Sequence, residues 1–570
     1  MSQIRAIGIK NFRSIKKFKW YPSPGLHCLI GCGDSGKTTI LDAIDLCLGA
    51  RRSYSFSDVD FHNLETHKPI IIRIALGDLD EQLMTFDIYG DFLQAYDHIN
   101  HKVLQEPEAG LEACLAIQLK VESDLEPQWS LVSRRAEEKG IQRFLRWDDR
   151  QRISPLRLGT HPDWHMSWRK GSIFQKLTEE SPDLTAALSS SARKAREDFG
   201  STANAQLTDT LNTVDETAES LGIEIGDGVS ALLDANAVSF GAGAVALHGA
   251  RSVPLTSLGT GSKTLLISGL ALKASHSSSI TLIDEVETGL EPHRIRRLLS
   301  DLGSKDQNSK LQTFTTSHSP VVLRELTYSQ LTIVRKNSSS GELTVIEPLE
   351  TSQAILRTAP EAFLAKSIVI CEGKSEIGFI RGIGHGRNKS HEILGVSLVD
   401  AGGTSGILPK ANEFLRLGFR TAIFMDSDRA LEQYGEESFL NNGGSIFKWP
   451  NGWALEDAIF QSVDDLPLEK LLNYAVSEVG EAKINDQIKS QSSNSYNLET
   501  IRHELHDQSV SLETVTILGK TAKAGAGWFK SIDRYEYVAN EIIAPNYAML
   551  DESFREVIDA LLKWMDWQNA

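Results

Sequence analysis

Residues 31–38 read Gly-Cys-Gly-Asp-Ser-Gly-Lys-Thr, which fits the pattern G-x-x-x-x-G-K-[S/T] in full. A strand-like run, Leu26–Ile30, precedes this stretch, and a helical pattern, Thr38–Leu48, follows it. Glycines let the backbone curl so that its N–H groups face phosphates, and the N-terminus of the following helix adds positive potential. We expect Lys37 to reach the β- and γ-phosphates of ATP and the Thr38 hydroxyl to bind Mg²⁺. The residues expected to contact ATP here are Gly31, Gly33, Asp34, Ser35, Gly36, Lys37, Thr38 and Thr39.

A phosphate-binding loop of this kind needs an acidic partner at the end of another strand. Ser279–Ile283 is an apolar run that ends in Asp284 and Glu285. Asp284 is expected to hold Mg²⁺ through water, and Glu285 to orient or activate the attacking water. His318 directly follows the strand-like run Gln312–Thr316 and is placed to contact a γ-phosphate.

A second Gly/Ser-rich stretch, Ser257-Leu-Gly-Thr-Gly-Ser262, precedes the helical pattern Lys263–Ala274 and is suited to binding phosphate. With Asn11-Phe-Arg-Ser14, IDEVETGLEP and TTSHSP, these motifs resemble the ABC-type ATPases of the RecF/SMC group. The resemblance implies two heads that face each other, with the second Gly/Ser motif contacting ATP across the dimer. It also implies an arm or dimerisation insertion at residues 131–240. The ATP contacts expected from the second motif are Ser257, Gly259 and Gly261.

In the second half of the chain, acidic residues follow three apolar, strand-like runs and open a helical one. The strands expected at 367–371, 396–399 and 421–425 alternate with helical patterns at 375–383 and 407–417, which implies a parallel sheet with right-handed crossovers. Parallel sheets place functional sites at the carboxyl ends of their strands, and carboxylates gathered there repel unless divalent cations lie among them. Oxygen-rich sites suit Mg²⁺ or Mn²⁺, and two such ions can activate water and stabilise a leaving oxygen. The expected metal ligands are Glu372, Glu376, Asp400, Asp426, Asp428 and Glu456, with Thr38 and Asp284 at the ion that accompanies ATP.

These acids, with their spacing over residues 365–460, resemble a Toprim domain, which is found in topoisomerases, primases and some nucleases. An ABC-type head followed directly by Toprim resembles the OLD (overcoming lysogenisation defect) family of nucleases over nearly the whole chain. The resemblance implies Glu372 as a metal ligand or acid/base group and a late basic residue near the metals. Lys523 and Lys530 are both candidates to stabilise charge on a phosphoryl oxygen, and the sequence does not choose between them. The catalytic residues implied are Glu372, Glu285, Lys530 and Lys523.

The 570 residues carry a net charge of −17, which argues mildly against a general nucleic-acid coat protein but not against local basic patches. Residues 134–170 form such a patch, with ten Lys/Arg and five Asp/Glu. It is the expected DNA path, and the alternative is a solvated face of an insertion. The five scattered cysteines are expected to be reduced thiols. Because residues 1–18 lack the apolar region of a signal peptide and no run is long enough to span a bilayer, we expect a cytoplasmic protein.

These patterns predict an α/β chain, in which an ABC-type P-loop ATPase head with a helical dimerisation insertion is followed by a Toprim domain. The Toprim domain is expected to have a Rossmann-like parallel sheet with helical additions. The expected boundaries are 1–130 and 241–355 for the two parts of the head, 131–240 for the insertion, and 356–570 for Toprim.

The predicted function is an ATP-binding DNA endonuclease that depends on Mg²⁺ or Mn²⁺ and is regulated by nucleotide. The resemblance alone implies anti-phage defence and a helicase partner. A homodimer or a higher homo-oligomer is expected from the ABC-type head. The first alternative is a non-cleaving RecF-type DNA-repair or clamp protein, against which the intact set of acids argues. A topoisomerase would need a catalytic tyrosine on a strand-passage scaffold, and a primase would need nucleotide polymerisation.

Overall fold

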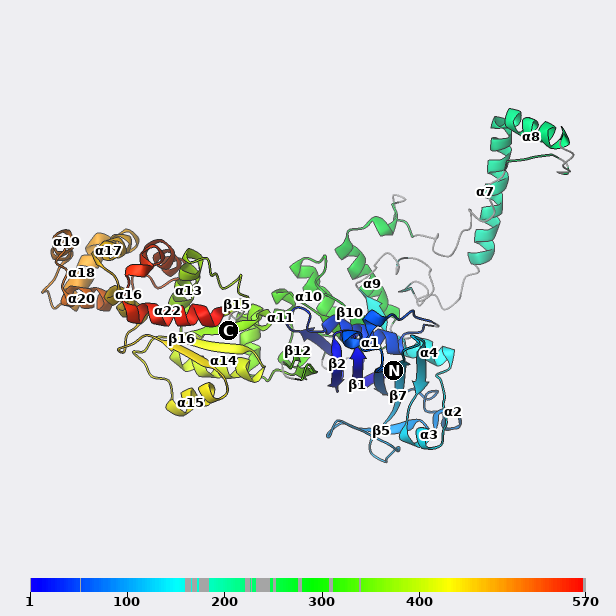
Figure 1. Cartoon of the computed structure of the whole chain (residues 1–570), viewed down its shortest axis with the longest axis horizontal. Coiled ribbons are helices and arrows are strands. Elements are labelled where there is room, and N and C mark those ends of the chain that lie inside the picture. The colour runs from blue at the N-terminus through cyan, green and yellow to red at the C-terminus, as the bar shows by residue number, and fades with distance from the viewer. Residues whose placement is uncertain are drawn as a thin grey trace. The chain divides into compact units, whose positions relative to one another are not determined.

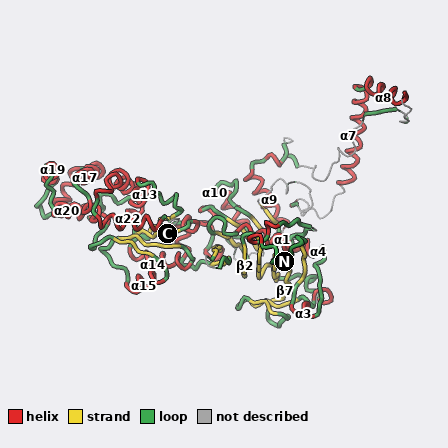
Figure 2. The backbone as a smooth tube through the Cα atoms, in the orientation of Figure 1, coloured by secondary structure: helices red, strands yellow, loops and turns green. Residues whose placement is uncertain are grey.

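The computed structural model describes residues 2–51, 53–158, 166, 172–173, 184–220, 226, 228–231, 247–249, 253–274, 279–306, 311–337 and 340–566 (Figure 1). The chain forms two compact units. The first unit consists of residues 1–29, 36–318 and 337–344, and the second of residues 30–35, 319–336 and 345–570. Both units contain helices and strands (Figure 2).

The first unit contains an antiparallel sheet with the strand order β2 (Ile15–Trp20), β1 (Gln3–Phe12), β4 (Ile70–Gly77), β7 (Glu112–Val121), β5 (Leu93–Asp97) and β6 (Lys102–Leu104). A further strand, β8 (Pro127–Leu131), pairs with β7. Successive side chains of a strand point to opposite faces, so Ile7 and Ile9 are buried while Lys10 is exposed. One face of this sheet therefore belongs to the core and the other carries polar side chains.

A set of parallel strands completes the sheets of the first unit, in the order β3 (Leu26–Ile30), β11 (Gln312–Thr316), β10 (Ile280–Ile283) and β9 (Leu156–Leu158). The helix α1 (Lys37–Leu48) follows β3 and packs against strands of both sheets. Its side chains Ile40, Leu41 and Ile44 are completely buried. The strand and the helix predicted on either side of residues 31–38 are thus confirmed.

Helices frame the sheets of the first unit. The helix α9 (Thr260–Ala274) begins inside the second Gly/Ser motif, and α10 (Pro292–Asp301) follows β10. The helices α7 (Leu184–Gln206) and α8 (Thr208–Ser220) lie within the helical insertion predicted at residues 131–240, other parts of which lie outside the described residues. The shorter helices are α2 (Phe86–Tyr89), α3 (Arg134–Glu138) and α4 (Trp147–Ile153).

The second unit is centred on a parallel sheet with the strand order β15 (Val396–Asp400), β14 (Ser367–Cys371), β16 (Arg420–Met425) and β17 (Ser445–Lys448). Two helices, α13 (Lys374–Gly386) and α14 (Thr404–Arg416), follow β14 and β15, so the predicted β-α-β-α-β order is confirmed. The strand β17 extends that order. Because Cys371 is aligned with both Asp400 and Phe424, the carboxyl ends of three strands lie along one edge.

Most of the remaining second unit is helical, as predicted. Its other strands are β12 (Leu331–Lys336) and β13 (Leu343–Ile346), the latter crossing the boundary between the units. Its other helices are α11 (Pro320–Glu325), α12 (Ser352–Thr358), α15 (Gln433–Asn441), α16 (Leu455–Ser462), α17 (Asp465–Val479), α18 (Glu481–Gln491), α19 (Leu498–His506), α20 (Leu512–Lys523), α21 (Ile532–Tyr537) and α22 (Glu552–Met565).

One face of α13 is a ridge of glycines at every fourth position, Gly378, Gly382 and Gly386, because residues four apart share a helix face. A Cβ added at Gly378 would lie 2.3 Å from the carbonyl oxygen of Ile532, and one at Gly382 would lie 2.3 Å from that of Glu536. Only glycine permits so close an approach of two backbones. The ridge therefore lets α21 lie directly against α13.

All five cysteines are free thiols, as predicted, and four of them are buried. Burial raises the pKa of the Cys47 thiol to about 12 and that of Cys371 well above its ordinary value. Such thiols carry little thiolate, which is the reactive form. The four buried cysteines are therefore structural residues of the core.

Candidate functional site

Residues 31–38 form the turn between β3 and α1. Asp34 and Gly36 have φ angles of 59° and 87°, in the left-handed region. A Cβ added at Gly31 would lie 2.5 Å from the carbonyl oxygen of Val334, so this position requires glycine. Lys37, the first residue of α1, is only 6% exposed. The turn thus has the curled backbone and the helix N-terminus that a phosphate-binding loop needs.

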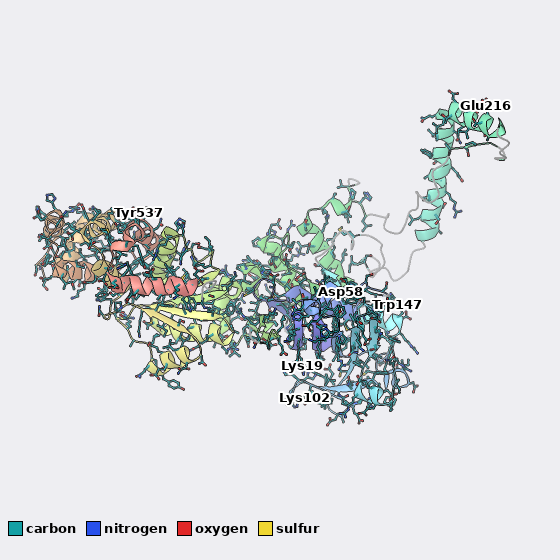
Figure 3. All side chains as sticks on the ribbon, in the orientation of Figure 1. Lys19, Asp58, Lys102, Trp147, Glu216 and Tyr537 are labelled. Carbon is teal, nitrogen blue, oxygen red and sulfur yellow. The ribbon has the colours of Figure 1, made fainter. Side chains whose placement is uncertain are left out.

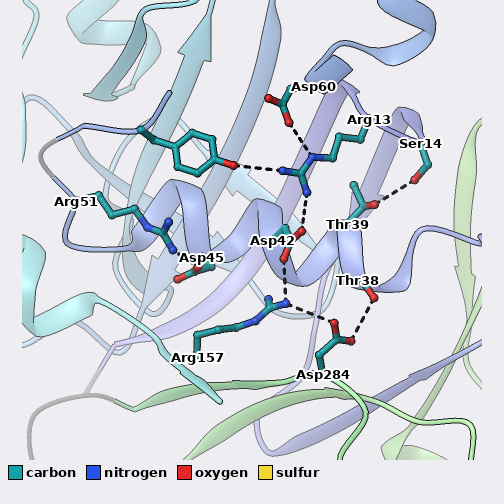
Figure 4. Close-up of polar contacts among 11 residues, drawn as sticks. Arg13, Ser14, Thr38, Thr39, Asp42, Asp45, Arg51, Asp60, Arg157 and Asp284 are labelled. Atoms are coloured by element: carbon teal, nitrogen blue, oxygen red, sulfur yellow. Dashed lines mark hydrogen bonds and ion pairs between the residues drawn. The ribbon is translucent and has the colours of Figure 1, made fainter. Parts of the chain in front are cut away.

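Asp284 lies directly after β10 and beside the first turn of α1 (Figure 4). Its Oδ1 accepts hydrogen bonds from Thr38 Oγ1 at 3.2 Å and from Thr316 Oγ1 at 2.6 Å. Its Oδ2 lies 3.6 Å from Nη2 of Arg157. The fold therefore brings together Thr38 and Asp284, the two residues predicted at the ATP-linked ion, and places a cation beside the carboxylate.

A chain of ion pairs continues from Arg157 (Figure 4). Its Nη2 lies 2.9 Å from Asp42 Oδ1, and Asp42 Oδ2 lies 2.6 Å from Nη1 of Arg13. Arg13 Nε in turn lies 2.9 Å from Asp60 Oδ1. Asp42 was not among the predicted site residues, and Arg157 was read only as part of a basic run. No local signal in the sequence joins them, since they are 115 positions apart.

Glu285 and His318 lie close to this network. Glu285 has a φ of 49°, its backbone N–H donates to Thr316 Oγ1 at 2.8 Å, and its carboxylate accepts from Thr288 Oγ1 at 3.2 Å. His318 is exposed, and its backbone N–H donates to Glu287 Oε1 at 2.6 Å. This hydrogen bond links the backbone at His318, which follows β11, to the loop that follows β10.

The second Gly/Ser motif packs against the loop that follows Glu285. A Cβ added at Gly261 would lie 2.0 Å from the carbonyl oxygen of Gly289, so the two backbones touch. Arg294 Nη1 donates to Ser262 Oγ at 3.1 Å. Ser257 and Gly259 are exposed immediately before α9. The motif is thus held rigidly by its own chain while its first residues face outward.

Among the described residues, many basic side chains of the run at 134–170, the expected DNA path, have partners within their own chain. Arg135 donates to the carbonyl oxygens of Gly90 and Leu93, and Arg150 donates to that of Gly49 and lies 4.4 Å from the ring centre of Trp129. Other members of the run pair with acids: Arg134 with Glu138, Lys139 with Asp91, and Arg157 with Asp42 and Asp284. Arg169 and Lys170 lie outside the described residues. The contacts of the described part of the run are thus made within the first unit.

In the second unit, Glu372 and Asp426 lie at the carboxyl ends of β14 and β16. Glu372 accepts hydrogen bonds from Thr404 Oγ1 at 2.8 Å and from the backbone N–H of Asp426 at 3.4 Å. Asp426 Oδ1 accepts from the backbone N–H of Leu455 at 2.9 Å, at the start of α16. These hydrogen bonds fix both carboxylates at the same edge of the sheet.

Two further carboxylates, Glu376 and Glu456, are almost completely buried beside them, at 4% and 5% exposure. Glu376 Oε2 also accepts from the backbone N–H of Gly373 at 2.7 Å. Burial, followed by repulsion from Glu456 and Glu372, raises the pKa of Glu376 to about 7. Burial, followed by repulsion from Glu376, Glu456, Glu372 and Asp428, raises the pKa of Asp426 to about 9. We call Glu372, Glu376, Asp426 and Glu456 the carboxylate cluster.

Tyr535 closes this cluster from the side of α21, and no sequence pattern pointed to it. Its side chain is completely buried, and its hydroxyl faces Glu456 without a well-aligned hydrogen bond. Burial and then the charge of Glu456 raise the pKa of Tyr535 well above its ordinary value. The glycine ridge of α13 brings this tyrosine to the acids, since the Tyr535 Cβ lies against Gly378.

The two candidate lysines differ in what they contact. Lys523 Nζ lies 2.7 Å from Asp457 Oδ2 and 3.7 Å from Asp428 Oδ2. Lys530 Nζ instead donates to the backbone carbonyl oxygens of Lys523 and Gly525, at 2.9 and 3.4 Å. The ammonium of Lys523 therefore lies beside the carboxylates of Asp457 and Asp428, whereas Lys530 stabilises the turn that follows α20.

Two family models match the chain. The model described as "AAA domain, putative AbiEii toxin, Type IV TA system" matches residues 26–324, just over half of the chain, so the chain belongs to that family. The model described as "Overcoming lysogenization defect protein-like, TOPRIM domain" matches residues 363–428, which include Glu372, Asp400, Asp426 and Asp428. The chain is an OLD-family protein. Its ABC-type ATPase domain precedes an OLD-like Toprim domain, as the sequence resemblance implied.

Single relatives add little to this assignment. The OLD-family chain is 44% identical over 54 residues to the DNA replication and repair protein RecF of Nitrosococcus oceani, a match that covers 10% of this chain and only 15% of RecF. Among solved structures, an Smc head domain from Pyrococcus furiosus and the SMC head domain from Thermotoga maritima are each 14% identical, with TM-scores of 0.35 and 0.29. The matches cover 100% and 99% of those two structures and 63% and 61% of this chain, respectively. Scores this low support no conclusion about the fold.

The donors of the OLD-like Toprim domain suit a hard divalent cation, because they are carboxylate oxygens gathered in a mostly buried place. Among the described residues, however, no three His, Cys, Asp or Glu side chains already converge as a finished metal site. Asp400 is engaged locally, with Oδ1 accepting from the backbone N–H of Gly402 at 2.7 Å. The carboxylate oxygens present are nonetheless of the kind that a hard divalent cation binds.

The described helices include none that is both long and apolar enough to pass through a lipid bilayer.

Proposed function

We propose that this OLD-family protein is an ATP-binding DNA endonuclease that depends on Mg²⁺ or Mn²⁺ and is regulated by nucleotide. The observation that carries the proposal is the carboxylate cluster, in which burial and mutual repulsion raise the pKa of Glu376 and Asp426. A protein that buries carboxylates together loses free energy unless cations neutralise them. Divalent cations at such a site are the usual means of hydrolysing a phosphodiester.

The residues that would hold the ions are Glu372, Asp426 and Asp428, with Glu376, Glu456 and Asp400 in supporting positions. Bound there, Mg²⁺ or Mn²⁺ would supply an activated water and neutralise charge on the scissile phosphate. Glu372, oriented by Thr404, is also placed to accept a proton. Lys523, whose ammonium lies beside Asp457 and Asp428, is the group that stabilises the phosphoryl oxygen. Lys530 acts on this site by holding the turn after Lys523.

In the ATPase domain, residues 31–39 bind the triphosphate, while Thr38 and Asp284 hold the accompanying Mg²⁺. Glu285 orients the attacking water, and His318 contacts the γ-phosphate. The second Gly/Ser motif, through the exposed Ser257 and Gly259 and the buried Gly261 beside them, completes the site of a second copy in a homodimer or higher homo-oligomer. A cytoplasmic role in anti-phage defence, with a helicase as a partner, is part of the same proposal.

A plasmid-cleavage assay tests the proposal. Parent protein should nick or cut plasmid DNA with Mg²⁺ or Mn²⁺, and added ATP should change the rate. Asp426→Ala should remove cleavage, and Lys37→Ala should remove only the response to ATP. Asp486→Asn is a matched control, because Asp486 is an exposed acid on α18 of the same unit, and it should cleave like the parent. Cleavage by Asp426→Ala at the rate of the parent would contradict the assignment of the carboxylate cluster as the nuclease site.

A second candidate rests on the local identity to RecF. In that case the protein binds ATP and DNA without cutting DNA, and the carboxylate cluster has lost its catalytic role. The same assay separates the two functions. Absence of metal-dependent cleavage on linear, nicked, supercoiled and single-stranded DNA, with ATP binding intact, would favour the RecF-like function.

A further inference from the structure

The outward face of the antiparallel sheet contains a concavity of about 640 Å³ that the proposed chemistry does not use. Gln94, Gln105 and Ser133 contribute neutral polar groups to it, and Glu137 is its single acid. Two of its basic residues, Lys19 and Lys102, lie near each other at the lower edge of the first unit in Figure 3. Its lining includes six exposed basic residues, Lys10, Lys17, Lys19, Arg73, Lys102 and Arg134. We call this concavity the basic trough.

The strand register explains why the trough is hollow. Gly8 of β1 lies opposite Lys19 of β2 on one side and opposite Arg73 of β4 on the other. Neighbouring strands are about 4.8 Å apart, so the backbones that carry Lys19 and Arg73 lie roughly 10 Å apart, with no side chain on the residue between them. Two strand positions away, Ala6 is aligned with Ala75. Small residues thus form the floor, and long basic side chains form the walls.

The arrangement of charge is costly for the isolated sheet. Lys10 and Lys17 are paired directly across β1 and β2, and like charges in that position destabilise a sheet. Lys17 reaches Glu342 at 3.1 Å, whereas Lys10 forms no ion pair among the described residues. Lys19 is held over the ring of Tyr21, 4.9 Å from its centre. Arg134 pairs with Glu138, and Arg73 donates only to the neutral Gln118. Lys10, Lys19, Arg73 and Lys102 therefore form no ion pair among the described residues and keep their charge for an anion from outside.

We propose that the basic trough binds the phosphate backbone of DNA and delivers DNA to the enzyme. The proposal rests on the proposed function, since it names the surface by which this protein holds its substrate. Lys, Arg and neutral polar side chains are the groups that contact phosphate and sugar in protein–DNA complexes. The uncharged floor leaves room for a sugar–phosphate strand between the two basic walls. Its basic residues are scattered through residues 10–134, which is why no run of charge in the sequence reveals the trough.

DNA binding of full-length protein, measured by fluorescence anisotropy over a range of salt concentrations, tests the trough. The variant K10Q/K19Q/R73Q should bind duplex DNA at least tenfold more weakly at low salt, and its slope of log K against log salt should be less steep by about 2–3, at ~0.9 per phosphate contact. The matched control K68Q/R297Q/K305Q removes three exposed cations outside the trough and should bind like the parent. ATP binding should be unchanged in both variants.

Gly8→Leu tests the shape of the trough without changing its charge. An added Cβ at Gly8 meets only the carbonyl oxygen of Arg73, at 3.9 Å, so a side chain fits the strand and projects into the hollow. This variant should also weaken DNA binding, with its melting temperature retained.

The outcomes for the trough and for the nuclease are separable. Parent-like DNA affinity and salt slope in K10Q/K19Q/R73Q would overturn the trough, even if Asp426→Ala abolishes cleavage and so supports the nuclease. Loss of DNA binding in that variant, with no cleavage by the parent, would support the trough and overturn the nuclease. Displacement of DNA by polyglutamate at equal charge concentration would also overturn the trough, because it would indicate a general acidic-protein surface.

Discussion

The nucleotide site and the carboxylate cluster both place acids at the ends of parallel strands, yet they balance charge differently. Asp284 receives hydrogen bonds from two threonine hydroxyls and has the guanidinium of Arg157 beside it. Asp426 has one backbone hydrogen bond and several other carboxylates around it, and its pKa is raised to about 9. The first site has a balancing cation from its own chain, whereas the second gathers acids that repel one another and that, in the proposed function, bind divalent cations from solution. An acid at a strand end therefore predicts a metal site, but its neighbours decide whether the site is complete before metal binds.

The largest expected effect comes from making the same Asp→Asn substitution at each of the two sites. Asp426→Asn should lower metal-dependent cleavage by at least about 100-fold, as loss of a group that stabilises charge in the transition state commonly does, while leaving ATP hydrolysis intact. Asp284→Asn should lower ATP hydrolysis by a similar factor and leave ATP-independent cleavage intact. Both activities are measured on each purified variant. Loss of both activities in both variants would erase the distinction between the sites.

The second effect is a pH-dependent stabilisation by metal. Because the pKa values of Glu376 and Asp426 are raised to about 7 and about 9, the folded protein keeps protons that the unfolded chain loses above its ordinary carboxyl pKa of about 4. The free energy of unfolding of the metal-free protein therefore falls as pH rises through this window. Mn²⁺ takes the place of those protons, so its stabilising effect should grow from pH 6 to pH 8.5.

Thermal unfolding with and without Mn²⁺ measures this difference. A gain of several degrees is expected at the higher pH, at about 2–4 °C per kcal/mol for a unit of this size. Asp426→Asn should flatten the pH dependence. A Mn²⁺ effect of the same size at both pH values would show that the cluster is not protonated in the metal-free protein.

A third, smaller effect concerns Arg157, whose side chain is 14% exposed between Asp42 and Asp284. Arg157→Gln should lower the free energy of unfolding of the nucleotide-free protein by about 2 kcal/mol, as expected for a lost charged hydrogen bond. Mg²⁺ with ATP should restore much of this loss, because the ion brings positive charge back to Asp284. Arg157→Lys should retain part of the stability. Equal destabilisation with and without Mg²⁺–ATP would contradict a charge-balancing role.

The smallest effect separates the two lysines. Lys523→Gln should lower cleavage about tenfold, since one hydrogen-bond donor to a developing negative charge is worth at least that much. Lys530→Gln should have a weaker effect, because its ammonium contacts only backbone carbonyl oxygens. Single-turnover cleavage at saturating DNA gives both rates. A larger loss for Lys530→Gln would reverse the assignment.

The sequence predicted those parts of the fold that depend on local pattern. The strand at 26–30, the helix from residue 38 and the parallel strands ending near Asp400 and Asp426 all agree with the structure, because apolar runs bounded by glycine and acid identify buried strands. The acids of the carboxylate cluster were named for the same reason.

The parts that were missed depend on contacts between distant segments. Arg157 meets Asp42 across 115 positions, and Tyr535 meets the acids only because α21 lies against α13. The partners of the basic run were not foreseen, because charge in a sequence does not reveal whether a partner is near: Arg135 and Arg150 are bound to backbone carbonyl oxygens. The choice between Lys523 and Lys530 likewise needed the position of Asp457.

The glycine ridge of α13 affects the pKa values of the buried carboxylates, although it does not contact them through a side chain. A methyl group added at Gly382 has no room before the backbone of α21, so the two helices would separate and carry Tyr535 away from Glu456. Water would then enter beside the buried carboxylates and return their proton affinity towards that of a free carboxylic acid. Residues with no functional group of their own therefore control how strongly the acids hold their protons.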